Sequence, residues 1–264
     1  MSSTPSIEIR LAESEDAAAI ALLLAEAFAE SPLDSGAQFE TNCVQCTGMT
    51  DTLSTERRPT SGEEIANSIS HGVGLVLAIV ATPILIIAAN RYGTVWNMVG
   101  VSVFAASMLM LYLASTLYHA LTHGAAKRIF RMLDHGAIFL LIAGTYTPFT
   151  LGVLRGPWGW TLLGLVWALA IIGLTMKAVF GHRFAWMSVV LYLTMGWLVV
   201  IAAPQVMQRV PMSGLAWILA GGIAYTGGVG FYAAHRVRYA HFAWHLFVIA
   251  GTACHFFAVL WYSA

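Results

Sequence analysis

Long apolar stretches, separated by short segments with basic residues, dominate the chain from residue 65 to the C-terminus. Seven of these stretches run for at least 20 residues without Asp, Glu, Lys or Arg. About 20 apolar residues, at roughly 1.5 Å of rise per residue in an α-helix, cross the roughly 30 Å hydrocarbon core of a membrane. The pattern therefore predicts an all-α integral membrane bundle of seven transmembrane helices. Their expected cores are residues 68–89, 97–119, 134–154, 158–178, 184–203, 214–234 and 241–262.

Charged residues divide the chain and orient the predicted bundle. Twelve of the 13 acidic residues lie before residue 65, and the 200 residues that follow contain a single acid, Asp134. With a cytoplasmic N-terminus, nine Lys and Arg residues fall on cytoplasmic connections, whereas Arg91, Arg155 and Arg209 fall on outer ones. Basic residues accumulate on the cytoplasmic side of membrane proteins. We therefore expect the N-terminus to be cytoplasmic and the C-terminus to lie outside.

The composition narrows the class of protein further. Hydrophobic residues make up 58% of the chain and charged residues 10%, whereas a soluble domain carries about 25% charged residues. The formal net charge is zero, which argues against a nucleic-acid partner because such a module needs a basic surplus. Membrane lipids are the expected partners, and the expected location is the cell membrane, as a multi-pass protein of a bacterial inner membrane. No pattern in the sequence indicates an oligomeric state.

Residues 1–60 differ from the rest and are expected to form a poorly ordered tail, followed by a membrane domain over residues 61–264. The segment IEIRLAESEDAAAIALLLAEAFAE, residues 7–30, resembles the opening strand and first helix of a GNAT-type acetyltransferase. The acetyl-CoA loop is missing, so a remnant of a fused domain is as plausible as a functional tail. Residues 31–62 are rich in Ser, Thr, Pro and Gly, as is typical of a linker. Cys43 and Cys46 lie in this linker, and a single CxxC favours two unpaired cysteines over a metal site.

Two histidines, His241 and His245, open the predicted seventh helix. Their spacing of four places both imidazoles on one helical face, one turn apart. That is the geometry of two ligands for one metal ion. The alternative is a pair of interfacial histidines that form hydrogen bonds with neighbouring helices.

A second pair with the same spacing, Ser115 and His119, closes the predicted second helix, and Asp134 opens the third. In the topology above, His119, Asp134 and the two histidines of the seventh helix all lie at cytoplasmic helix ends, at one depth. Three imidazoles with an open fourth position are typical of a catalytic zinc site. Asp134 would then support a ligand or act as a base for water at the metal. Ser115, one turn deeper than His119, would form a hydrogen bond with the same water.

These residues also have simpler interpretations. Asp134 would serve as a helix N-cap, or would pair with Arg128 or Arg131. Ser115 would be an ordinary interface residue, since Ser is common where membrane helices meet.

Three further polar residues, Glu64, Asn67 and His71, share one face of the predicted first helix at the same level. They would either support the metal ligands or form interhelical hydrogen bonds at a polar helix start, and the sequence favours neither. His255 lies ten residues beyond His245, about 15 Å deeper in the membrane. It cannot bind the same metal and is interpreted as a packed or hydrogen-bonded core histidine.

Four motifs occur in order on this seven-helix frame: EEIANSISHGVG, ASTLYHAL, LDHGAIFLLIAGTYTPF and HFAWHLFVIAGTACHF. Residues 60–264 thereby resemble the bacterial hemolysin III family, which is related to the progestin and adipoQ receptors and more distantly to alkaline ceramidases. The resemblance implies a seven-helix bundle with a zinc ion near the cytoplasmic face. The ligands would be His119, His241 and His245. Asp134 and Ser115 would hold or activate the zinc-bound water.

Three functional hypotheses follow. The resemblance implies a zinc-dependent hydrolase of lipid amide or ester bonds, with lipids such as ceramide as the type of substrate. The second hypothesis is a non-catalytic receptor or regulator of membrane lipid state or energetics, in which zinc braces the helices. The third is a cytolysin, as the family name suggests. It ranks last because the predicted helices offer little charged lining for a hydrophilic pore.

Overall fold

The computed structural model describes residues 57, 59–181, 185–234 and 236–263. Within these ranges, seven helical segments are long and apolar enough to cross a membrane, which confirms the predicted all-α bundle. They are α2 (Ser61–Tyr92), α3 (Val95–Ala120), α4 (Ala125–Leu151), α5 (Pro157–Phe180), the segment Ala185–Arg209, α8 (Met212–Ala233) and α9 (Ala240–Tyr262). The predicted tail, its acetyltransferase-like segment and the Cys43–Cys46 pair lie outside the described residues.

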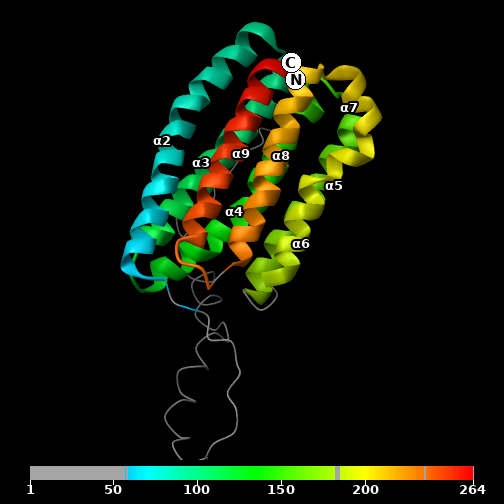
Figure 1. The fold of residues 1–264 in the computed structure, drawn as a ribbon. Coiled ribbons are helices and arrows are strands. Elements are labelled where there is room, and N and C mark those ends of the chain that lie inside the picture. The colour runs from blue at the N-terminus through cyan, green and yellow to red at the C-terminus, as the bar shows by residue number, and fades with distance from the viewer. Residues whose placement is uncertain (1–56, 58, 182–184, 235, 264) are drawn as a thin grey trace, which may run out of the picture. The chain divides into compact units, whose positions relative to one another are not determined.

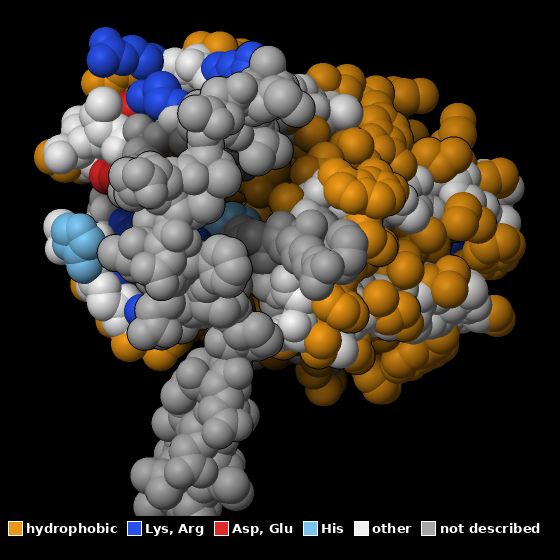
Figure 2. All heavy atoms as spheres, turned by 90° about the horizontal axis from the view of Figure 1, so that it is seen from below, with side chains coloured by type: hydrophobic (Ala, Val, Ile, Leu, Met, Phe, Trp, Pro, Cys, Tyr) orange, Lys and Arg blue, Asp and Glu red, His pale blue; other side chains and the backbone are white. Residues whose placement is uncertain are grey.

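The helices pack chiefly against their neighbours in sequence: α2 on α3, α3 on α4, α4 on α5 and α8 on α9. The last helix, α9, also contacts α2 and α4, so the two ends of the membrane domain lie side by side (Figure 1). Large apolar side chains cover much of the outer surface, as the view from the end where α2 and α9 begin shows (Figure 2). Lipid solvates such a surface and water does not, so the exposed face agrees with a membrane location.

A network of hydrogen bonds joins the starts of α2 and α9. The Thr60 hydroxyl accepts from the Glu63 backbone N–H at 3.3 Å, and the Glu63 carboxylate accepts from the Thr60 backbone N–H at 2.8 Å. This reciprocal pair is a capping box, which fixes the beginning of α2. Glu63 also binds the Arg57 guanidinium and accepts from the backbone N–H of Tyr239, at 2.9 Å. Tyr239 precedes α9 with φ of 57°, so Glu63 holds the turn that leads into the helix carrying His241.

Helix α4 begins earlier than the hydropathy pattern predicts. The expected core starts at residue 134, but the helix starts at Ala125. Asp134 is therefore a buried residue in the third turn, and its interpretation as an N-cap is wrong. The additional turns carry Lys127, Arg128 and Arg131, which lower the hydropathy of a segment that is nevertheless helical.

The fifth span is broken, whereas an uninterrupted helix over residues 184–203 is predicted. It consists of α6 (Ala185–Gly196), the 3-10 helix η2 (Leu198–Ala202) and α7 (Ala203–Arg209). The break releases backbone groups that the membrane interior leaves without water. Tyr146 on α4 satisfies two of them, because its hydroxyl donates to the Gly196 carbonyl at 2.9 Å and accepts from the Val199 N–H at 3.0 Å.

Replacing Tyr146 with Phe removes both bonds and keeps the ring. We expect Tyr146→Phe to lower the free energy of unfolding by roughly 1–3 kcal/mol, because two backbone groups at the break lose their partner. Denaturant titration in detergent micelles measures this change. Tyr92→Phe is the matched control, since Tyr92 is 78% exposed, and its stability should stay within about 0.5 kcal/mol of the parent. Equal stability of both variants would show that Tyr146 does not support the break.

Candidate metal centre

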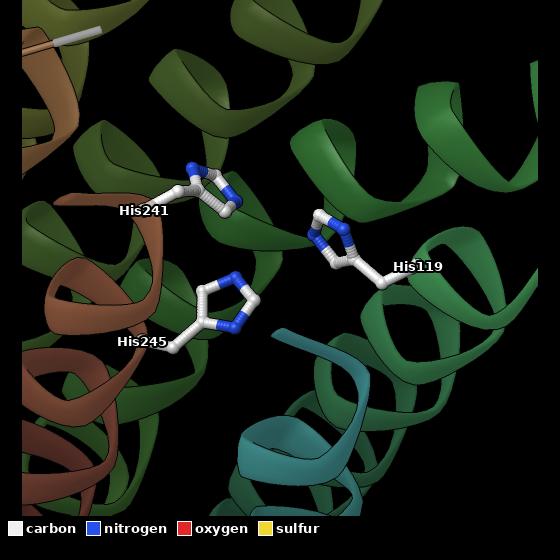
Figure 3. Close-up of side chains that lie close together, drawn as sticks. All are labelled: His119, His241 and His245. Atoms are coloured by element: carbon white, nitrogen blue, oxygen red, sulfur yellow. The ribbon is translucent and has the colours of Figure 1, made fainter. Parts of the chain in front are cut away.

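Three imidazoles from two helices point toward one another at the end of the bundle where α9 begins (Figure 3). His119 comes from the last turn of α3, and His241 and His245 come from the first two turns of α9. One ring nitrogen of each lies within 4.8 Å of the other two. Three nitrogens at about 2.0–2.1 Å from one zinc ion would lie about 3.3 Å apart, so small side-chain adjustments close the site. The three predicted ligands therefore lie close enough to hold a metal ion.

The ring of His119 is oriented by a carboxylate. Its Nδ1 lies 2.6 Å from Oε2 of Glu64 on α2. The Nε2 is buried and has no hydrogen-bond partner among the described residues. One nitrogen bound to a carboxylate and the other left open is the usual arrangement of a metal-binding histidine. Lys127 lies 3.4 Å from the other Glu64 oxygen and donates to the Leu121 carbonyl at 2.8 Å, which keeps the carboxylate in place.

The ring of His245 is oriented by the backbone and a hydroxyl of α2. Its Nδ1 lies 3.2 Å from the Asn67 carbonyl oxygen and 3.0 Å from the Ser70 Oγ. Because Ser70 already donates its proton to that carbonyl, at 2.8 Å, both neighbours act as acceptors for the imidazole. The hydrogen bonds thus assign the proton of His245 to Nδ1. Its Nε2 keeps the lone pair that a metal needs.

A fourth imidazole, His71, packs against the site. Its ring stacks on His245 with centroids 3.5 Å apart and an interplanar angle of 11°, and it meets the edge of Tyr112 at 5.2 Å. The side chain is buried, and neither ring nitrogen has a hydrogen-bond partner in the described part of the chain. Both interpretations left open for the polar face of α2 agree with the structure, because its interhelical hydrogen bonds are made to the candidate ligand rings. Glu64 and the Asn67 carbonyl contact two of the ligand rings, and His71 stacks on one of them. The sequence pattern does not predict a role for Ser70, although it lies three residues after Asn67 and so shares that face.

The two residues predicted to act on water lie beside this centre. Asp134 is buried on α4, interacts electrostatically with His119, and lines the same cavity as His241. Ser115 is fully buried and faces the Asp134 carboxylate, but no hydrogen bond of ordinary length joins its hydroxyl to any described residue. The structure therefore gathers all five predicted site residues at one end of the bundle.

The neighbours of Asp134 differ from those that the simpler interpretation expected. Neither Arg128 nor Arg131 pairs with it in the part of the chain that the structure describes. Instead, Nδ1 of His135 lies 3.6 Å from Asp134 Oδ2 and 2.7 Å from the Arg131 carbonyl oxygen. An ideal helix turns His135 about 100° away from Asp134, so helical spacing alone does not place it at this site. Its side chain nevertheless reaches both the carboxylate and the cavity wall.

A cavity of about 410 Å³ leads away from the metal centre. Asp134, His241 and His245 line one end, and Leu154 and Met212 line the other. Leu154 follows the far end of α4 and Met212 begins α8, so the cavity follows most of the length of the bundle. Its walls are mostly Leu, Ile, Val and aromatic side chains. The polar centre therefore opens onto a long apolar space.

Fold and site together define a membrane protein with seven spans and a buried histidine cluster suited to a metal ion. A family model described as "Haemolysin-III related" matches residues 60–256, and the chain belongs to this family. Hemolysin-3 of Bacillus cereus is 48% identical over 200 residues, which cover 76% of this chain and 91% of that protein. The hemolysin-3 homolog of Bacillus subtilis (strain 168) is 47% identical over 76% of this chain and 94% of its own length. The human monocyte to macrophage differentiation factor is 25% identical over 208 residues, or 76% and 85% of the two chains. The protein is thus a multi-pass protein of the bacterial cell membrane.

Removing two of the three ring ligands tests the metal centre. We expect purified protein to carry about one zinc ion per chain, and the His241→Ala, His245→Ala double variant to carry none, because one imidazole cannot retain the ion alone. Elemental analysis after gel filtration measures the metal content. His255→Ala, which removes a histidine about 15 Å away on the same helix, is the control and should retain the zinc. An unchanged zinc content in the double variant would refute the ligand assignment.

The hydrogen bond between Glu64 and His119 should tune metal affinity. Glu64→Gln weakens the acceptor that orients the ring, and such changes typically cost 10–100-fold in metal affinity. Competition with a chromogenic chelator measures the affinity of the detergent-solubilised protein. Ser68→Ala is the control, because the Ser68 hydroxyl, on the same helix, binds the Thr116 carbonyl and no ligand ring. If both variants hold zinc as tightly as the parent, Glu64 does not support the site.

Proposed function

We propose that the protein is a zinc-dependent hydrolase of lipid amide or ester bonds. One observation carries the proposal: two of the three clustered histidines, His241 and His245, line the same long, mostly apolar cavity as the buried Asp134 carboxylate. A polar reaction centre at the end of an apolar channel suits a substrate with one reactive polar bond and a long hydrocarbon chain.

The donor set fits zinc. Imidazole nitrogen is a preferred zinc ligand, and three protein ligands with an open fourth position are typical of catalytic zinc sites. The buried Nε2 of His119 lacks a partner among the described residues, and a metal ion would satisfy it. When bound, zinc supplies Lewis acidity, which lowers the pKa of water from 15.7 to about 7 and polarises a carbonyl.

The chain's own residues would handle the proton. Asp134 accepts a proton from the attacking water as the new C–O bond forms at the acyl carbon. It then returns that proton to the leaving amine or alcohol as the C–N or C–O bond breaks. Ser115, which faces the Asp134 carboxylate from α3, orients that carboxylate and the water with its hydroxyl. His119 and His245 keep fixed orientations throughout, because Glu64 and the Asn67 carbonyl hold them.

The cavity would hold the acyl chain. Its volume of about 410 Å³ falls within the usual range of small-molecule sites, and its length follows the helices. Each methylene group moved out of water contributes about 0.8 kcal/mol, so a long chain binds without further polar contacts. Membrane lipids supply such chains directly.

A purely structural metal would not need this arrangement. The three histidines come from α3 and α9 alone, whereas Asp134 is placed beside them by a third helix, α4. Within the described residues no arginine neutralises that carboxylate and the His135 ring lies 3.6 Å from it, whereas a buried carboxylate in a membrane bundle is costly. A role for Asp134 as proton acceptor explains this cost better than a metal ion that only holds the helices together.

Asp134→Asn separates catalysis from metal binding. We expect the variant to keep its zinc and to lose hydrolysis of a short-chain fluorescent ceramide by about 10²–10⁴-fold, because an amide does not accept the proton. Chromatographic separation of the released fatty acid measures turnover, with elemental analysis run on the same sample. The His241→Ala, His245→Ala variant is the matched control and should lose both zinc and turnover. Equal turnover by Asp134→Asn and the parent would remove Asp134 from catalysis.

A further inference from the structure

Away from the metal centre, one polar side chain in the described part of the chain lines the cavity without a hydrogen-bond partner. His255 on α9 lines the cavity, and no hydrogen bond joins either of its ring nitrogens to another described residue. The sequence suggested a packed or hydrogen-bonded core histidine, and the structure supports only the packing. Its imidazole lies against the backbone of α8 at Gly221, where a Cβ atom would come within 2.7 Å of Nε2. The ring therefore has a fixed place that depends on glycine at that position.

Tyr225 on α8 completes a polar ledge with His255. Both residues line the cavity, and their rings stack with centroids 5.4 Å apart and an interplanar angle of 23°. The Tyr225 hydroxyl lies 2.9 Å from the Thr252 Oγ1. Thr252 donates its own proton to the Val248 carbonyl, at 2.9 Å, and also accepts from the Tyr112 hydroxyl, at 2.9 Å. Tyr225 must therefore donate to Thr252, which leaves its oxygen with a lone pair for another donor.

Other polar groups around this part of the cavity are already paired. The Thr145 hydroxyl donates to the Ile142 carbonyl, and the Thr150 hydroxyl donates to the Tyr146 carbonyl. The Thr226 hydroxyl donates to the Gly222 carbonyl and accepts from the indole N–H of Trp197. Hydroxyls satisfied in this way add little polarity to the wall. The His255–Tyr225 ledge differs because it offers an open donor and open acceptors.

The distance along α9 sets what such a ledge could recognise. His255 lies ten residues beyond His245, or about 15 Å. An extended chain advances roughly 1.2 Å per bond, so a group at the ledge is about a dozen bonds from a head group at the metal centre. In that position a plain hydrocarbon leaves the imidazole without a hydrogen bond. A hydroxyl there would accept from the N–H of the ring and donate to the free lone pair of the Tyr225 oxygen.

We propose that His255 and Tyr225 form a second binding site, which selects acyl chains with a hydroxyl group about twelve carbons from the head group. The inference rests on the proposed function only in that the head group lies at the metal centre. The evidence for the ledge itself is the cavity, the fixed position of the His255 ring and the ring nitrogens that have no hydrogen-bond partner among the described residues. It would make the cavity selective for hydroxylated over plain chains.

Competitive binding to the purified, zinc-loaded protein in nanodiscs tests the proposal. Stearic acid and 12-hydroxystearic acid displace a radiolabelled stearic acid probe, and 2-hydroxystearic acid controls for the position of the hydroxyl. We expect about tenfold tighter binding of 12-hydroxystearic acid than of stearic acid, the effect of one or two net hydrogen bonds. The 2-hydroxy acid should show no preference that depends on His255.

Three variants assign the preference to the ledge. His255→Phe keeps a ring against Gly221 and should abolish the preference. Tyr225→Phe keeps the stacked ring and should reduce it severalfold, which provides a second test should the first variant fail to fold. Thr150→Val changes a cavity residue whose hydroxyl is already paired and should leave the preference intact.

Equal binding of the two fatty acids by the parent, or a preference that survives both ring variants, would overturn the proposal. Absence of binding by either fatty acid would also overturn it. Hydrolysis of the unsubstituted ceramide decides the proposed function separately. If ceramide is hydrolysed but the two fatty acids bind equally, the second binding site is rejected and the proposed hydrolase function stands. If ceramide is not hydrolysed but 12-hydroxystearic acid binds tenfold more tightly, the second binding site stands and the hydrolase function is rejected.

Discussion

A buried imidazole nitrogen without a partner is costly, because the interior of a membrane bundle offers no bulk water to satisfy it. In this protein α2 supplies a partner for one nitrogen of His119, through Glu64, and for one nitrogen of His245, through the Asn67 carbonyl. The remaining nitrogens are thereby turned toward a common point that His241 also faces. A single metal ion would satisfy all three at once. Two further contacts join α9 to α2, because Glu63 accepts from the backbone of Tyr239 just before α9 and His71 stacks on His245.

The polar centre and the apolar cavity are continuous with each other. Residues that would bind a metal or move a proton lie in the first two turns of α9, the last two turns of α3 and the third turn of α4. The rest of the cavity wall is mostly apolar or carries hydroxyls that pair with their own helix. The proposed chemistry would thus be confined to one end of the cavity, and recognition of the lipid chain to the remaining length. The open His255 ring departs from this division, which is why we assign it to the recognition of a polar group on the chain.

Hydropathy and charge predicted the seven spans, because an apolar stretch of membrane length has few alternative folds. Two helix boundaries could not be predicted in this way, for physical reasons. The start of α4 carries Lys127, Arg128 and Arg131, so its helix extends beyond the apolar core. The break after Gly196 depends on Tyr146, a partner 50 residues away in sequence that no local pattern reveals. A local signal did exist for α2, where Thr60-x-x-Glu63 is the pattern of a capping box.

The spacing of residues along the helices predicted the candidate site residues more completely than the residues that orient them. Residues four apart on one helix must share a face, so the Ser115–His119 and His241–His245 pairs could be identified before their partners were known. Ser70 acts together with a backbone carbonyl, which leaves no mark in the sequence. His135 reaches Asp134 through the flexibility of its side chain, which an ideal helical wheel does not represent.

The central claim is that three imidazoles and no other protein side chain bind one zinc ion in this bundle. X-ray absorption spectroscopy at the zinc edge, on protein purified with its native metal, tests it most directly. The account predicts a first shell of about four nitrogen and oxygen atoms at about 2.0–2.1 Å, with the outer-shell scattering of three imidazole rings. A first shell with sulfur at about 2.3 Å, or one built from oxygen without imidazole scattering, would contradict it.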